Sequence, residues 1–169
     1  CAGDMPEGLE VLGEKGEGGP LFPITTARVG AGVCMAMRRD VLMEVGPFDP
    51  ALGAGTSTRG GEDLDMFARI LATGDVIIHT PDALVHHRHR VDEAGLDKQI
   101  RGNGSGMAAL LTKAIIEKPS VLCTLVGRIP GILKRIKPGG ARVAGRDDDT
   151  PGSLTRSEIK GFLEGPFLY

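Results

Sequence analysis

The chain is poor in aromatic residues and in cysteine. Its 169 residues include no tryptophan, one tyrosine and five phenylalanines, and Cys1, Cys34 and Cys123 form no Cys-x-x-Cys pair. Three widely spaced cysteines are typical of free thiols in a reducing compartment rather than of a disulfide framework. No run of about 18 apolar residues occurs, so the sequence predicts no membrane-spanning helix.

The rest of the composition is ordinary for a globular protein. Hydrophobic residues make up 41% and charged residues 25% of the chain, which argues against a wholly disordered protein. The length suits one domain, or one domain with a tail. Because the chain starts at Cys1 and stops at Tyr169, just after a helical pattern, we expect a piece of a longer protein that is cut at both ends.

The net charge of -2 conceals a separation of charge along the chain. Residues 1–97 have a balance of -8, residues 98–146 of +9 and residues 147–169 of -3, which indicates two surfaces with different partners. The basic segment 98–146 has amphipathic stripes and fits either peripheral contact with an anionic membrane or a solvated basic face packed on the domain. It has no aromatic residue to stack on bases, so nucleic-acid binding is not predicted. Its basic side chains include Lys113, Lys118, Arg128, Lys134, Arg135 and Lys137.

Hydrophobic periodicity predicts short strands and helices. We expect loop over residues 1–23, strands over 30–37, 75–79 and 83–87, and a helix over 38–45 that buries Val41, Leu42 and Val45 and ends at Gly46. A glycine-rich loop with little to bury should follow over residues 48–61. Further helices are predicted through Met107–Ile115, from Val121 with a break or kink at Pro130, and over Leu154–Leu163, with a linker at 137–152. Gly102, Gly104 and Gly106 predict a weak or kinked helix, since each glycine costs about 1 kcal/mol relative to alanine.

The best-defined helix follows Gly60 and Gly61. Leu64, Phe67, Ala68 and Leu71 form one apolar stripe, Asp65 can pair with Arg69 one turn later, and Gly74 is a stop signal. The first turn carries Glu62, Asp63 and Asp65. These acids fit compensation of the helix dipole, but a carboxylate held at a helix start beside a glycine loop also suits a general base.

Histidines gather after the last predicted strand, at His86, His87 and His89. On an extended chain His87 and His89 share a face, and such a pair can ligate Mn²⁺ or Zn²⁺ if other groups complete the shell. The alternative is a solvated strand end, because Arg88 and Arg90 alternate with the histidines.

Together these segments resemble the C-terminal half of family 2 glycosyltransferases with a GT-A fold, of the actinobacterial type. The resemblance rests on residues 28–90, which read GAGVCMAMRRDVLMEVGPFDPALGAG, then GGEDLDMFARILATG, then PDALVHHRHR. The glycine triplet before a helix and the closing GFLEGPFLY resemble the tail of such members. The fold class implied is α/β, namely half of a Rossmann-like nucleotide-sugar transferase domain followed by an α-helical tail.

The resemblance implies an inverting, metal-dependent transfer of a sugar from a nucleotide-diphosphate donor to a saccharide or lipid-linked acceptor hydroxyl, as in cell-envelope polysaccharide or glycolipid synthesis. Asp63 matches the family's base. Glu62, Asp65 and Gly61 would orient the acceptor or the helix, and Gly30, Gly32 and Cys34 would lie near the donor sugar. His87 and His89 match the ligands of a divalent metal, Mn²⁺ or Mg²⁺. The expected location is the cytoplasm, at the inner face of the cell membrane.

Two departures from the family pattern keep an alternative open. Cys34 stands where such sequences often have Asn, and the nucleotide-binding half with its Asp-x-Asp motif is missing, so we expect this piece alone to be inactive. The alternative is a non-catalytic module, either a degenerate transferase half or a membrane-surface scaffold. The expected organisation is an incomplete N-terminal part at 1–27, the acceptor- and metal-side half at 28–92, basic helices at 93–136, and a linker with a final helix at 137–169.

Overall fold

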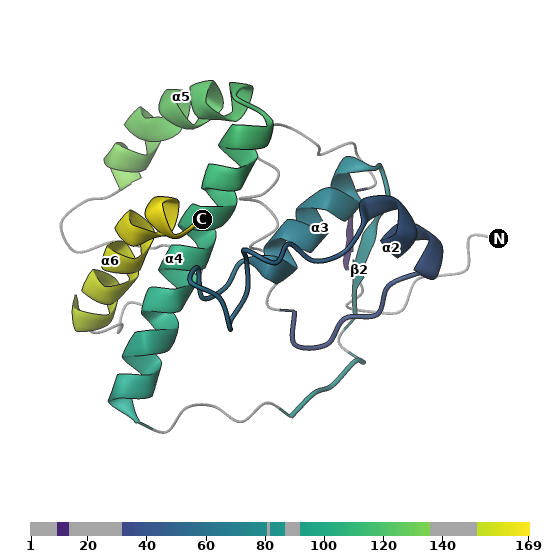
Figure 1. Ribbon diagram of the computed structural model, residues 1–169, viewed down its shortest axis with the longest axis horizontal. Coiled ribbons are helices and arrows are strands. Elements are labelled where there is room, and N and C mark those ends of the chain that lie inside the picture. The colour runs from purple at the N-terminus through teal and green to yellow at the C-terminus, as the bar shows by residue number, and fades with distance from the viewer. Residues whose placement is uncertain (1–9, 14–31, 81, 87–91, 136–151) are drawn as a thin grey trace.

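The computed structural model describes residues 10–13, 32–80, 82–86, 92–135 and 152–169. These residues form a mixed α/β arrangement. A two-stranded sheet and two short helices lie on one side of the molecule, and three longer helices lie on the other (Figure 1). The elements are β1 (Glu10–Leu12), α2 (Arg39–Val45), α3 (Glu62–Ala72), β2 (Ile77–His79), α4 (Glu93–Glu117), α5 (Ser120–Arg135) and α6 (Gly152–Leu168).

The sheet joins two segments that are far apart in the sequence. β1 pairs antiparallel with β2, with Glu10 opposite His79 and Leu12 opposite Ile77. The prediction of loop over residues 1–23 is therefore wrong for residues 10–12, because three residues are too few to show an alternating pattern. The strand expected over 75–79 is confirmed at residues 77–79.

Two other predicted strands are not strands where the chain is described. Residues 32–37, from the segment predicted over 30–37, form a turn followed by irregular chain in which Val33 and Met35 are exposed. Residues 83–86 are also irregular, and Leu84 and Val85 are exposed. A strand needs a neighbour for its backbone hydrogen bonds, and among the described residues the sheet has only β1 and β2.

The helix predicted over residues 38–45 is α2. It ends before Gly46, whose φ of 80° is in the left-handed region that glycine adopts at helix ends. Val41 is buried as expected and Val45 is half-buried, but Leu42 is exposed.

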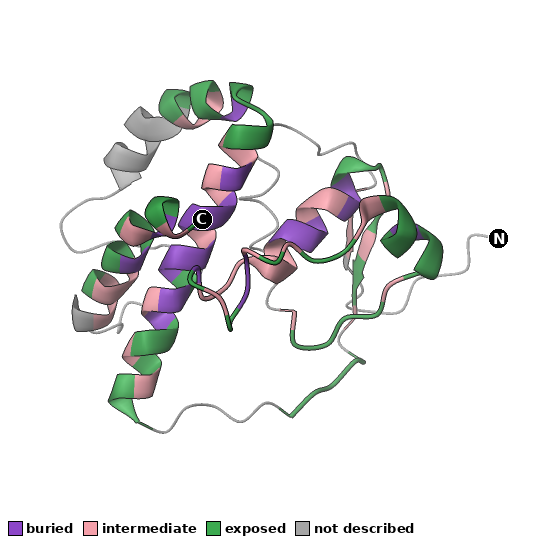
Figure 2. Ribbon diagram, viewed as in Figure 1, coloured by how far each residue is buried: buried purple, intermediate pink, exposed green. Residues whose placement is uncertain are grey.

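α3 buries two adjoining sides rather than one stripe. Met66 and Ile70 pack with Val41 of α2, while Leu64 packs against a second core cluster that includes Leu110 of α4. The single predicted stripe is too narrow because α3 lies between the sheet side and the helical side of the molecule (Figure 2). Within the predicted stripe, Phe67 and Leu71 are buried, whereas Leu64 and Ala68 are half-buried.

α4 continues through the glycine triplet as one helix of 25 residues, where the sequence predicted a weak or kinked segment. A Cβ on Gly104 would lie 2.2 Å from the carbonyl oxygen of Glu158 in α6. A Cβ on Gly106 would lie 2.5 Å from the carbonyl carbon of Gly60 in the loop before α3. Neighbours on two sides therefore require glycine here, and this packing offsets the poor helix propensity.

α6 runs beside α4 in the same direction and presents glycines to it. A Cβ on Gly161 would lie 2.0 Å from the carbonyl oxygen of Arg101, and one on Gly165 would lie 2.5 Å from that of Ser105. Glycines four residues apart share a helix face, so the two backbones meet closely along α6. This helix is longer than the predicted Leu154–Leu163 and includes Pro166.

α5 continues through Pro130, where a break or kink was predicted. No helix in the described part of the chain is both long and apolar enough to cross a membrane. The predicted linker at 137–152 lies, except for its last residue, outside the described residues.

Candidate active site

The loop over residues 46–61 brings the chain to the start of α3. We expected this loop to bury little, but Leu52 and Thr58 are buried. The Thr58 hydroxyl donates to the carbonyl oxygen of Ala51 at 2.9 Å, and the Thr58 carbonyl accepts from the hydroxyl of Ser105 at 2.8 Å. The loop is thus folded on itself and tied to α4.

Gly61 immediately precedes α3 and has a φ of 94°. This left-handed conformation favours glycine. A Cβ at this position would also lie only 2.7 Å from the carbonyl oxygen of Gly106 in α4. Gly61 therefore lets α4 pass closely and fixes the direction in which α3 begins.

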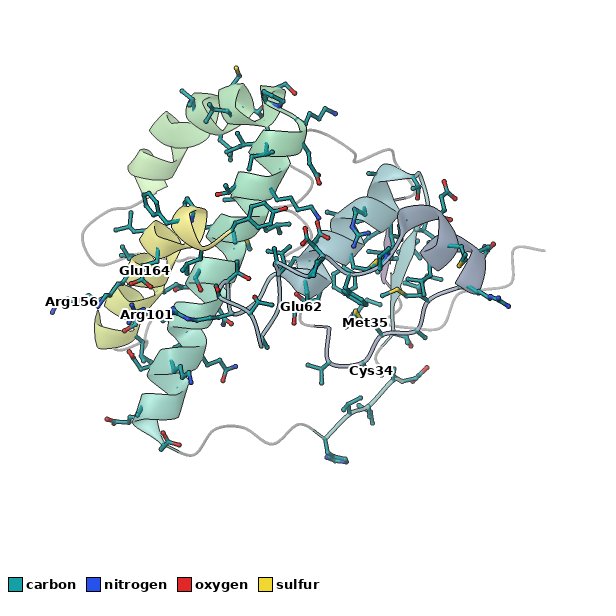
Figure 3. All side chains as sticks on the ribbon, viewed as in Figure 1. Cys34, Met35, Glu62, Arg101, Arg156 and Glu164 are labelled. Carbon is teal, nitrogen blue, oxygen red and sulfur yellow. The ribbon has the colours of Figure 1, made fainter. Side chains whose placement is uncertain are left out.

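Asp63 lies in the first turn of α3 and joins it to a distant segment. Its Oδ2 accepts a hydrogen bond from the backbone N–H of Gly32 at 2.7 Å, and its Oδ1 accepts from the N–H of Leu64 at 2.8 Å. Two predicted site residues that are 31 positions apart are thereby brought into contact. Cys34 lies in the exposed turn just beyond (Figure 3), and Gly30 lies outside the described residues.

Glu62 is half-buried at the junction between the loop and α3 (Figure 3). Its Oε1 accepts from the N–H of Ala54 at 3.4 Å, and its Cδ lies 3.7 Å from the Cβ position of Gly53. The side chain therefore contacts the glycine-rich loop.

Asp65 is buried, with a relative exposure of 3%. Its Oδ2 accepts from Nε of Arg69 at 2.9 Å, which confirms the predicted pair. Its Oδ1 lies 2.7 Å from Nζ of Lys113 in α4. Since Asp65 is buried and each of its carboxylate oxygens is paired with a cation, this geometry suits the role of orienting the helix and not that of contacting an acceptor.

Lys113 is the centre of a buried charge cluster. Its Nζ lies 2.9 Å from Oδ2 of Asp49, and the Tyr169 hydroxyl donates to the same carboxylate oxygen at 3.1 Å. Both interpretations of the basic segment require Lys113 to face solvent or a membrane. This prediction is wrong for Lys113, because the residue is only 6% exposed. Burial is tolerated because the ammonium group faces two carboxylates.

The pKa values of this cluster reflect that pairing. Burial alone would lower the pKa of Lys113, but its hydrogen bonds with Asp65 and Asp49 outweigh burial and raise the pKa above 10.5. Burial likewise acts to raise the pKa of Asp49, but the Ala51 N–H and the Lys113 ammonium lower it below 3.8. Burial, and then the Asp49 carboxylate, raise the pKa of Tyr169. Lys113 and Asp49 are therefore both charged at neutral pH.

This cluster was not identified from the sequence. The apolar stripe of the predicted helix gave no signal, because Lys113 lies to one side of the face that carries Leu110, Leu111 and Ala114. Nothing in the local sequence indicates which carboxylates pair with this lysine.

The other basic residues of the segment 98–146 are placed only in part. Arg101 is paired with Glu164 of α6, and its Nε donates to Oε2 of Glu164 at 3.0 Å. Lys118 is exposed. Lys98 is exposed as well. The remaining side chains lie outside the described part of the structure, namely those of Arg128, Lys134, Arg135, Lys137, Arg142 and Arg146.

The predicted metal ligands His87 and His89 also lie outside the described residues, and neighbouring His86 is exposed. Among the residues that the structure describes, no three His, Cys, Asp or Glu side chains gather closely enough to hold a metal ion. The donor chemistry of two imidazoles fits a divalent metal.

We compared the chain with known proteins. No family model, no curated protein and no solved structure matches it.

Proposed function

We propose that the chain is the acceptor-side half of an inverting family 2 glycosyltransferase with a GT-A fold, with Asp63 as its general base. The observation that carries the proposal is the 2.7 Å hydrogen bond between the Gly32 N–H and Oδ2 of Asp63. It joins the two segments to which the family resemblance assigns the donor sugar and the base. The mixed α/β arrangement is compatible with this assignment.

In the proposed reaction Asp63 takes the proton of the acceptor hydroxyl. The acceptor oxygen then forms a bond to the anomeric carbon, and the bond from that carbon to the diphosphate oxygen breaks, so that the nucleotide diphosphate leaves with the electron pair. The Gly32 N–H holds the Asp63 carboxylate in one direction, as a general base requires. Glu62 would hold the glycine loop beside the acceptor.

The resemblance assigns the donor side of the reaction to other residues. Gly30, Gly32 and Cys34 would lie near the donor sugar. His87 and His89 would hold a divalent metal, Mn²⁺ or Mg²⁺, which would supply electrostatic stabilisation of the departing diphosphate. The nucleotide-binding residues would come from outside this sequence, and the reaction would take place in the cytoplasm at the inner face of the membrane.

The test is the substitution Asp63→Asn in the full-length protein. We expect turnover to fall about a hundredfold to ten-thousandfold, the usual contribution of a general base, while donor binding measured by calorimetry stays nearly unchanged. Asp82→Asn is a matched control, because Asp82 is exposed and is not part of α3. Unchanged turnover in Asp63→Asn would exclude Asp63 as the base.

One observation favours the alternative, a non-catalytic module. Both carboxylate oxygens of Asp63 already accept backbone hydrogen bonds, as they would if the residue only tied the Gly32 turn to α3. In that case Asp63→Asn lowers the melting temperature, and the full-length protein transfers no sugar from any nucleotide donor. Donor-dependent transfer by the unsubstituted protein would rule this alternative out.

A further inference from the structure

The outward face of α6 is an apolar stripe without a partner in the described structure. Glycines fill the face toward α4, whereas large side chains occupy the opposite side of the helix. Leu163 is 68% exposed and Phe167 is 90% exposed. The outward apolar face comprises Ile159, Phe162, Leu163 and Phe167, all exposed. They follow the pattern i, i+3, i+4, i+8, which places them along one side of the helix.

The charges of α6 are divided between its two sides. Glu164 turns toward α4, where it pairs with Arg101, and it also pairs with Arg59 of the loop before α3. Arg156 points away from α4 (Figure 3). Arg156 and Lys160 are exposed, and neither forms an ion pair with any residue of the described chain. The outward side therefore combines apolar residues with two unpaired cations and no exposed carboxylate.

We propose that the outward face of α6 lies on an anionic lipid surface. A helix that presents Phe and Leu together with cations on one side can lie in the headgroup region, with its apolar side chains among the acyl chains and the long cationic side chains reaching the phosphates. The two cations would pair with lipid phosphates. This surface lies outside the basic segment 98–146 in which the sequence predicted membrane contact, and it does not depend on the chemistry of Asp63.

Charge favours lipid over a second copy of this chain. A second copy laid against this face would bring the same two cations and no exposed carboxylate, so Arg156 and Lys160 would gain no partner. Anionic headgroups supply negative charge all along the helix. A contiguous exposed apolar patch flanked by one sign of charge is typical of an interaction surface rather than of a merely solvated face.

The test is sedimentation of the full-length chain with vesicles, either of phosphatidylcholine alone or with phosphatidylglycerol added, at low salt. We expect binding to the anionic vesicles. The double variant Leu163→Ser/Phe167→Ser should weaken it at least about tenfold, from the loss of inserted apolar surface. Arg156→Gln/Lys160→Gln should weaken it about fivefold for each cation removed, and added salt should abolish this difference.

Matched controls come from α2, on the far side of the molecule (Figure 1). Met43→Ser removes a side chain that is 74% exposed, and Arg39→Gln removes an exposed cation; neither should change vesicle binding. Because every substituted side chain is exposed, we expect unchanged melting temperatures. If the apolar double variant unfolds, the charge variant decides the outcome on its own.

Three results would overturn the proposal. The first is no sedimentation with anionic vesicles at low salt. The second is equal binding by the α6 variants and the α2 controls. The third is a dimer in analytical ultracentrifugation that dissociates in Leu163→Ser/Phe167→Ser, since the face would then be an interface between two copies. None of these readouts involves sugar transfer, so the outcome is separate from that of the proposed reaction.

Discussion

Lys113 connects parts of the chain that the sequence places far apart. Its ammonium group contacts Asp65 of α3 and Asp49 of the preceding loop, and Asp49 also accepts from Tyr169 beyond the end of α6. The direction of α3, and with it the position of Asp63, therefore depends on a residue of α4. Lys113 is accordingly a positioning residue for the candidate site.

Replacing Lys113 by Met keeps most of the side-chain volume and removes the charge. Asp49 and Asp65 then lose the buried cation with which they are paired. Removing one partner of a buried ion pair costs about 3–5 kcal/mol. We expect the free energy of unfolding in urea to fall by that order. Lys118→Met, at an exposed position one turn beyond Lys113, should change it by less than about 0.5 kcal/mol. Equal effects of the two substitutions would contradict the role given to the cluster.

At the scale of elements, glycine decides how α4 and α6 meet. Propensity alone disfavours glycine within helices, yet α4 and α6 both carry it where their backbones come close. Gly127 in α5 is a contrasting case, because a Cβ there meets nothing within 4 Å. Glycine is thus needed for close packing in α4 and α6, whereas in α5 Gly127 only lowers the stability of the helix.

This contrast predicts opposite signs for one substitution. Gly161→Ala places a Cβ 2.0 Å from the carbonyl oxygen of Arg101, and we expect a loss of stability of about 1–3 kcal/mol, as for overpacking. Gly127→Ala has space and should raise stability by about 0.5–1 kcal/mol through better helix propensity. Thermal or urea unfolding of the two variants measures both signs. Stabilisation by Gly161→Ala would show that α6 does not pack against α4 as described.

At the scale of the whole molecule, charge pairs join the helical side to the sheet side and α6 to α4. Asp49 and Glu164 have pKa values below their ordinary ones. For Asp49, burial acts in the opposite direction and is outweighed. For Glu164, the hydrogen bond with Arg101 is the main cause. Lys113 has a raised pKa. Folding therefore favours the ionised forms of Asp49, Glu164 and Lys113. The free energy of unfolding should fall both at acid pH and at strongly alkaline pH.

A carboxylate with a lowered folded pKa stabilises the protein above its unfolded pKa, and this stability is lost as the pH falls. The unfolded values are 3.8 for Asp49 and 4.5 for Glu164, so stability should drop across and below that range. The raised pKa of Lys113 adds stability that is present below 10.5 and lost as the pH rises further. Urea midpoints between about pH 7 and pH 2 test the acid side. Lys113→Met should flatten this fall, and an unchanged slope would contradict the pairing with Asp49.

Several local features were predictable from the sequence. The bounds of α3, the end of α2 at Gly46 and the pair of Asp65 with Arg69 all follow from relations within one or two helical turns. The carboxylates at the start of α3 were also located correctly, because helix starts have strong local signals. The catalytic role of Asp63 and the metal ligation by His87 and His89 remain predictions.

Other features depend on residues that are distant in the sequence. The sequence by itself determined the bounds of α2 and α3, because neighbouring residues settle where those helices begin and end. It did not determine the bounds of α4 and α6 or the continuity of α5 at Pro130. Only the tertiary structure decided that residues 10–12 pair with β2, that Lys113 is buried, that the glycines of α4 serve packing, and that Gly32 meets Asp63. The physical reason is that each of these contacts joins segments at least 31 residues apart, and such contacts form through the packing of whole elements, which local periodicity does not encode.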